Sequence, residues 1–213
     1  MRKASSAAGL AVACLLSTAS IALAADPGTE DPNNWPQYNR TANAWRYSPL
    51  DQINKDNVGK LSVAWIAHGG DITMGLQETP LVIDGVIYSI SSGDKVAALD
   101  GKTGQTIWSY EPKLDPITKK VLFSPYSRGV AVGHGMVFIG TVDGRGIALD
   151  PKSGKLKWYR QEIVKDVWDY DAPYEVMLFK KDGKDVIVHL NKSGYVFVLD
   201  KNTGNIENIR SAI

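Results

Sequence analysis

The sequence predicts an all-β protein built from repeated, four-stranded antiparallel units. One pattern recurs three times at a spacing of 50 residues, at 98–108, 148–158 and 198–208. Each copy has an Asp followed four residues later by a Gly, and the first two copies end in a Trp. A fixed period of this length marks a supersecondary unit that buries its faces only by stacking on its neighbours.

The residues around each repeat predict strands and turns. Runs rich in β-branched and aromatic residues, bounded by Gly, Asp and Lys, have the composition of strands; they are 86–90, 137–139 and 186–190. Each is followed by a short stretch suited to a tight hairpin turn, and these stretches are Ser92-Gly93-Asp94, Asp143-Gly144 and Ser193-Gly194. The Asp-x-x-x-Gly stretch predicts a second turn. Each unit is therefore about four short strands, the content of a propeller blade.

The architecture expected is thus a partial β-propeller of about three blades with a leading segment, and no helix of ordinary length after residue 30. Propellers close with about four to eight blades, so a chain with three would carry open sheet edges through which it could self-associate. We expect the tryptophans Trp65, Trp108 and Trp158 to pack between blades, because a buried indole contributes a large apolar area.

The N-terminus and the composition predict an exported protein. A basic start, an apolar stretch and an Ala-x-Ala exit at 22–24 are typical of a cleavable signal peptide, so the predicted domains are a signal peptide at 1–24, a leading segment at 25–61 and the incomplete propeller at 62–213. Cys14, the only cysteine, lies in the signal, where a lipid-anchoring signal is the alternative. With 24 basic and 23 acidic residues there is no basic field to favour nucleic acid. No membrane span is expected after cleavage.

Several motifs together resemble one family. Asn34-Trp-Pro-Gln-Tyr-Asn-Arg40, Tyr47-Ser-Pro-Leu50, the stretch 54–61 with Trp65, and the recurring Asp-x-x-x-Gly-x-x-x-Trp pattern are similar to those of quinoprotein alcohol dehydrogenases. The resemblance implies a periplasmic propeller of the eight-bladed quinoprotein type. It also implies oxidation of a primary alcohol to an aldehyde with pyrroloquinoline quinone (PQQ) and a calcium or lanthanide ion, and transfer of electrons to a separate cytochrome c.

The same resemblance implies three cofactor-binding residues. Glu78 matches a glutamate that contacts the quinone, although a carboxylate at a strand start is the alternative. Arg128 matches an arginine that binds a cofactor carboxylate, a task that suits the planar guanidinium; a surface ion pair is the alternative. Lys192 stands where the family places Arg or Lys against the quinone oxygens, and a plain hairpin-turn lysine is an equal alternative.

The segment Asp166-Val-Trp-Asp-Tyr-Asp171 resembles the family's catalytic loop. By that match Asp169 is the catalytic base and a metal ligand, and Asp171 is the further metal ligand of the lanthanide-using subgroup. In an extended stretch the side chains of residues i and i+2 point the same way, and two converging carboxylates favour a hard cation between them. A solvated acidic turn is the alternative.

The family pattern is broken in two places. Leu122 and Phe123 stand where the family has adjacent cysteines, and there is no Cys-x-x-Cys-His for a covalently bound haem. Trp158 is only eleven residues from Asp169, whereas the family inserts further blades there, so the sequence predicts a fragment or deletion variant. The rival interpretations are a non-catalytic periplasmic propeller scaffold of the outer-membrane assembly type, or a remnant that binds PQQ or metal without turnover.

Overall fold

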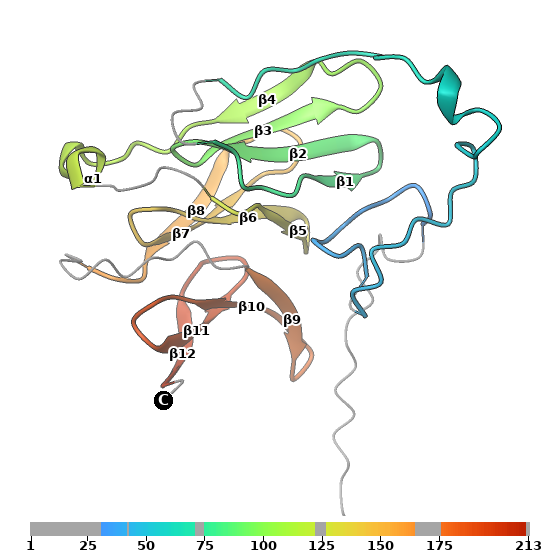
Figure 1. Ribbon diagram of the computed structural model, residues 1–213. Helices are drawn as coiled ribbons and strands as arrows, with labels where there is room; N and C mark the ends of the chain where they lie inside the picture. The colour runs from blue at the N-terminus through green and yellow to red at the C-terminus, as the bar shows by residue number, and fades with distance from the viewer. Residues whose placement is uncertain (1–30, 42, 71–74, 122–126, 165–175, 212–213) are drawn as a thin grey trace, which may run out of the picture.

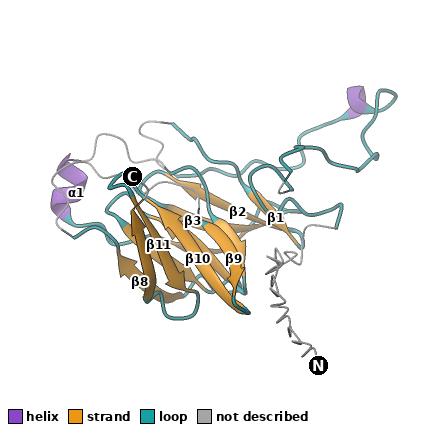
Figure 2. Cartoon of the chain, turned by 90° about the horizontal axis from the view of Figure 1, so that it is seen from below, coloured by secondary structure: helices purple, strands orange, loops and turns teal. Residues whose placement is uncertain are grey.

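The computed structural model describes residues 31–41, 43–70, 75–121, 127–164 and 176–211, and within them it forms three four-stranded antiparallel sheets (Figures 1 and 2). The strands are, in chain order, β1 (Leu81–Ile83), β2 (Val86–Ser91), β3 (Lys95–Asp100), β4 (Thr106–Tyr110), β5 (Ala131–Gly133), β6 (Met136–Gly140), β7 (Arg145–Leu149), β8 (Leu156–Gln161), β9 (Met177–Lys181), β10 (Lys184–Leu190), β11 (Tyr195–Asp200) and β12 (Ile206–Ser211). Each sheet takes its strands in sequence order. The predicted all-β, partial-propeller fold is confirmed.

The three sheets share one register. The central strands pair Tyr88 with Ala98, Phe138 with Ala148 and Val188 with Val198. Each sheet also has a register shift at the same place in its third strand, between the residues 98/99, 148/149 and 198/199. The 50-residue period of the sequence is therefore also the structural period, one sheet per repeat.

The Asp-x-x-x-Gly turn between the third and fourth strands is built the same way in each sheet. In the first sheet Asp100 Oδ1 accepts hydrogen bonds from the Thr103 amide (2.8 Å) and the Thr103 hydroxyl (2.9 Å). Gly104 N donates to the Asp100 carbonyl at 2.8 Å, with φ of 71° at Gly104. These bonds, those from Thr103 first, hold the pKa of the Asp100 carboxyl below its ordinary value. Asp150 and Asp200 repeat the arrangement in the other sheets.

The glycine of each turn supports an indole from the preceding repeat. A Cβ atom at Gly154 would lie 2.5 Å from the Trp108 ring, and the Trp108 indole N–H donates to the Pro151 carbonyl at 2.8 Å. Trp158 docks in the same way over Gly204, and Trp65, outside any described strand, docks over Gly104. The predicted packing between blades is thus confirmed for Trp108 and Trp158, which lie in the clusters between neighbouring sheets. Trp65 is part-buried and contacts the turn of the first sheet alone, so its place between two blades stays a prediction.

Two hydrophobic clusters fill the spaces between neighbouring sheets. The cluster between the first and second sheets includes Tyr88 and Trp108, whose rings are 6.2 Å apart. The cluster between the second and third contains the equivalent pair, Phe138 and Trp158, at 6.0 Å. The corresponding positions of the third sheet are Val188 and Asn208, so its outward face lacks the aromatic pair that closes the other two interfaces.

Helix is nearly absent from the described chain, as predicted. It consists of a 3-10 turn, Val58–Lys60, and α1 (Pro116–Val121) on the connection between the first two sheets. Neither has the length or hydrophobicity that a bilayer crossing requires. The leading segment joins the first sheet through a bridge between Trp35 and Val82. The domain boundaries at 24 and 61 stay predictions.

Replacing Gly154 by alanine is expected to destabilise the fold through both backbone and side chain. The φ of 67° costs a side-chain-bearing residue about 1–2 kcal/mol, and displacing the Trp108 ring adds about 1–3 kcal/mol. Gly183→Ala is the matched control, because Gly183 has φ of 77° but nothing within 4 Å of the added Cβ. Urea denaturation should show the larger loss of unfolding free energy for Gly154→Ala, and equal losses would contradict the docking role of this glycine.

Candidate functional site

The turns between the second and third strands of the sheets, residues 92–94, 141–144 and 191–194, lie along one end of the stack, which we call the turn rim. Asp94 in the first turn accepts a hydrogen bond from Val142 N in the second at 2.8 Å. Glu162 N donates to the Gly144 carbonyl of the second turn at 2.9 Å, while the Glu162 carboxylate accepts from Asn191 in the third at 3.4 Å. In Figure 1 these turns lie toward the side where α1 is drawn.

Glu78 lies at this rim, three residues before β1. Its carboxylate accepts hydrogen bonds from the Ser89 hydroxyl and from Ile90 N, both at 2.5 Å, just before the first rim turn. Burial raises the pKa of the Glu78 carboxyl, and the bonds from Ser89 and Ile90 partly oppose that rise. The carboxylate is therefore fixed in orientation and partly shielded from water.

Arg128 is exposed and lies beside the Glu78 segment. A Cβ atom placed on its neighbour Gly129 would be 3.5 Å from the carbonyl oxygen of Thr79. The segments that start β1 and β5 are therefore in contact at the rim end of their sheets. None of the ion pairs found among the described residues involves Arg128.

Lys192 is exposed in the third rim turn. The turn is organised by Asn191, whose side-chain oxygen accepts hydrogen bonds from Ser193 N at 3.0 Å and from the Ser193 hydroxyl. Three of the predicted site residues thus come from three different repeats to one rim. Asp169 and Asp171, together with Trp168, Leu122 and Phe123, lie outside the described residues. Within the described ranges, no group of three His, Cys, Asp or Glu side chains gathers as a metal site would.

Sequence reasoning missed two buried polar groups near the rim. The Asp94 carboxyl is 0% exposed, and burial raises its pKa to about 7 against the opposing bond from Val142 N. The 50-residue register held a signal for Asp94, because it aligns an Asp with Gly144 and Gly194. In the structure Asp94 has the positive φ of those glycines, at 60°. The other group is the pair Glu162 and His189, both of which are buried.

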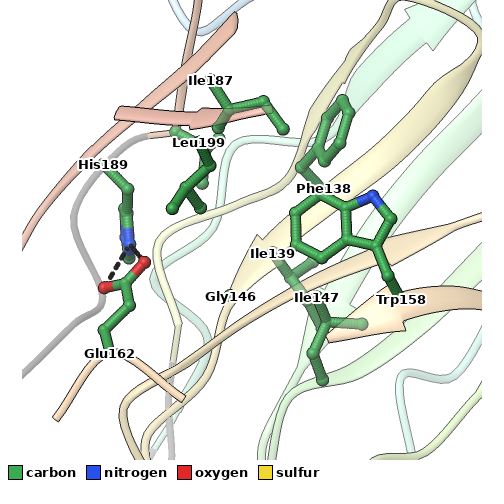
Figure 3. Close-up of a pocket in the computed structure, with 10 residues that line it drawn as sticks. Phe138, Ile139, Gly146, Ile147, Trp158, Glu162, Ile187, His189 and Leu199 are labelled. Atoms are coloured by element: carbon green, nitrogen blue, oxygen red, sulfur yellow. Dashed lines mark hydrogen bonds and ion pairs between the residues drawn. The ribbon is translucent and has the colours of Figure 1, made fainter. Parts of the chain in front are cut away.

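Glu162 and His189 border a cavity of about 10 Å³ between the second and third sheets (Figure 3). The rest of its wall is largely apolar, with Phe138 and Trp158 on one side. A larger pocket of about 500 Å³ includes Asp84, His134 and Gly135. These residues belong to the turns that join the first and second strands, at the end of the sheets opposite the turn rim, so this pocket is separate from the predicted site.

Comparison with known proteins identifies relatives over most of the chain. A family model described as the glucose/ethanol/alcohol dehydrogenase β-propeller domain, PQQ type, matches residues 35–150 and 145–208. The dehydrogenase subunit of a quinone-type alcohol dehydrogenase from Gluconobacter oxydans is 38% identical over 83% of this chain and 24% of its own length. A quinohemoprotein alcohol dehydrogenase from Pseudomonas putida is 36% identical over 92% of this chain and 29% of its own.

Solved structures give the same result. The crystal structure of a quinohemoprotein alcohol dehydrogenase from Comamonas testosteroni matches with a TM-score of 0.71 at 33% identity, over 84% of this chain and 27% of that one. A europium-containing methanol dehydrogenase matches with a TM-score of 0.76 at 29% identity, over 87% of this chain and 33% of that one. The chain therefore spans between a quarter and a third of the length of these proteins.

Proposed function

The chain belongs to the PQQ family of glucose, ethanol and alcohol dehydrogenase β-propellers, and we propose from this premise that its turn rim binds PQQ for oxidation of a primary alcohol to an aldehyde. The observation that carries the proposal is the meeting of the Glu78 and Arg128 segments at the rim that also carries Lys192. Three repeats contribute one candidate residue each.

The described residues have a chemistry that fits PQQ. The Arg128 guanidinium is exposed and can pair bidentately with a carboxylate of the cofactor. Glu78 is held by Ser89 and Ile90 before any ligand arrives, so binding would not have to order it. Lys192 would bring a positive charge to the quinone oxygens.

The chemical step is proposed for the loop that contains Asp169. When bound, the quinone accepts the hydride equivalent of the alcohol. Asp169 would take the hydroxyl proton as general base, and Asp169 with Asp171 would hold a calcium or lanthanide ion through oxygen ligands. The europium in the matched methanol dehydrogenase supports the lanthanide alternative.

We further propose a periplasmic location after removal of residues 1–24, and a separate cytochrome c as electron acceptor. A relative from Thauera butanivorans, named 1-butanol dehydrogenase (cytochrome c), is 35% identical over 83% of this chain. The family model matches in two segments that overlap at 145–150, inside the second repeat, which supports a deletion between similar repeats. Full turnover by this chain is therefore a separate proposal from cofactor binding.

Reconstitution tests this function. The exported chain, purified and mixed with PQQ and either Ca²⁺ or La³⁺, is expected to show the absorbance of bound cofactor. Alcohol oxidation with an artificial electron-accepting dye that falls at least about 10²-fold in Asp169→Ala supports catalysis by this base. Binding without turnover favours the cofactor-binding remnant, and a folded chain that binds nothing favours the scaffold.

Arg128→Ala is expected to weaken PQQ binding by at least about tenfold, because it removes a charge-assisted pair. Arg128→Lys should recover only part of the affinity, since an ammonium lacks the planar fork. Arg46→Ala is the matched control, because Arg46 is exposed in the leading segment, bonded to Asn39. Fluorescence titration measures all three, and equal affinities for Arg128→Ala and the control would remove Arg128 from the site.

A further inference from the structure

We propose that Glu162 is a positioning residue, which holds the third rim turn and its Lys192 against the end of the second sheet. The role of Lys192 rests on the proposed function, but the fixing of the turn is a property of the chain alone. Glu162 directly follows β8, and its side chain is fully buried. Two residues of the third sheet, His189 and Asn191, hydrogen-bond to its carboxylate.

The strongest contacts join Glu162 to His189. Both carboxylate oxygens lie close to His189 Nδ1, at 2.7 and 2.8 Å, as Figure 3 shows. Because a carboxylate is an acceptor, this geometry assigns a proton to Nδ1. His189 is the penultimate residue of β10. Glu162 thereby fixes the end of the strand from which the third rim turn departs.

The next contact reaches the turn itself. Asn191 donates through its side-chain amide to Glu162 Oε2 at 3.4 Å, while its side-chain oxygen accepts from Ser193 N at 3.0 Å. Gly194 N also donates to the Asn191 carbonyl, at 3.3 Å. Lys192 lies between these bonded residues, so the backbone that carries it is fixed on both sides. Glu162 N is bonded in turn to Gly144 of the second rim turn.

Stability alone gives a poor account of this buried polar pair. The 50-residue register aligns Glu162 with Pro112 and His189 with Ile139, so the interface between the first two sheets has apolar residues at the equivalent positions, both of them buried. Replacing buried charged pairs by apolar residues of similar volume is often neutral or stabilising. The polar pair lies between the second and third sheets, and the third sheet carries Lys192 in its rim turn. This points to a role for the pair in holding the third rim turn in position.

Hydrogen exchange of the cofactor-free chain tests the inference, with the amides of 191–194 as the readout. Asn191→Ala breaks the link from Glu162 to the turn and should speed exchange there by at least about tenfold. The double variant Glu162→Leu/His189→Ile should keep the melting temperature within a few degrees or raise it, yet it should speed exchange at 191–194 similarly. The 141–144 turn is the internal reference. The control variant is Glu111→Leu, because Glu111 is an exposed glutamate that lies one residue before Pro112, the position equivalent to Glu162.

PQQ affinity is the second readout, expected to fall at least about tenfold in both test variants but not in the control. If the wild-type chain binds no PQQ, the proposed function is wrong. The exchange experiment still tests whether Glu162 fixes the 191–194 turn, because it uses the cofactor-free chain. If 191–194 exchange at the wild-type rate in a folded double variant, Glu162 is an ordinary contact between sheets and the inference is wrong.

Discussion

Replacing Trp108 by alanine is expected to lower the free energy of unfolding by about 3–5 kcal/mol. The indole is buried between the first and second sheets, against Tyr88 and over Gly154. Its N–H donates to the Pro151 carbonyl at 2.8 Å, so the substitution also removes the shorter of that carbonyl's two hydrogen bonds and leaves only the one from the Tyr88 hydroxyl at 3.5 Å. The loss is a large fraction of the roughly 5–15 kcal/mol that stabilises a typical domain. Urea denaturation followed by circular dichroism measures it.

Trp45→Ala is the control for this experiment. Trp45 is 74% exposed in the leading segment, so the same chemical change should alter stability by no more than about 0.5 kcal/mol. If Trp108→Ala were as stable as Trp45→Ala, the interfaces between sheets would not depend on the docked indoles. The propeller interpretation of the 50-residue repeat would then lose its main energetic support.

Replacing Asp94 by asparagine is expected to remove most of a pH dependence of stability. Burial raises the pKa of Asp94 to about 7 in the folded chain, from an ordinary value of 3.8. Between these values the folded state holds a proton that the unfolded state has lost, so stability falls as pH rises through this window. Above pH 7 the penalty is complete, at about 4 kcal/mol.

Asparagine keeps the acceptor for Val142 N and tolerates the positive φ of 60° at this position. Asp94→Asn should therefore be more stable than the wild type at pH 8 and nearly equal to it at pH 4. The control is Asp56→Asn, an exposed aspartate in the leading segment. Thermal denaturation at pH 4, 6 and 8 provides the comparison. If the melting temperatures of the wild type and of Asp94→Asn changed by the same amount between pH 4 and 8, the pKa of Asp94 would not be raised in the folded chain, and the prediction would be wrong.

The fold was predictable from the sequence because its determinants are local and repeated. Asp100 and Gly104 form a turn from their own neighbours, and the alternation of apolar residues sets the strands around it. Three copies made the register clear without knowledge of any contact. Even the packing of Trp108 on the next repeat follows from that repetition, since Trp158 occupies the equivalent place at the next interface.

The site was only partly predictable because its contacts join distant repeats. The prediction of Glu78, Arg128 and Lys192 rests on the family resemblance, and no local pattern requires these residues to share a rim. The pair of Glu162 and His189 is separated by 27 residues and depends on how the second and third sheets face each other. Asp94 needs the same information, because its burial comes from the neighbouring turn at Val142. Asp169 and Asp171 stay predictions from the family resemblance.

The most direct test of the central claim is hydrogen exchange of the whole chain with and without PQQ and Ca²⁺. One site built by three repeats predicts simultaneous protection of three separated segments, 76–80, 127–130 and 190–194, with no change at 84–85, 134–135 and 182–183 at the opposite end of the sheets. Protection of only one of the three rim segments, or protection at the opposite end, would contradict a shared cofactor site on the turn rim.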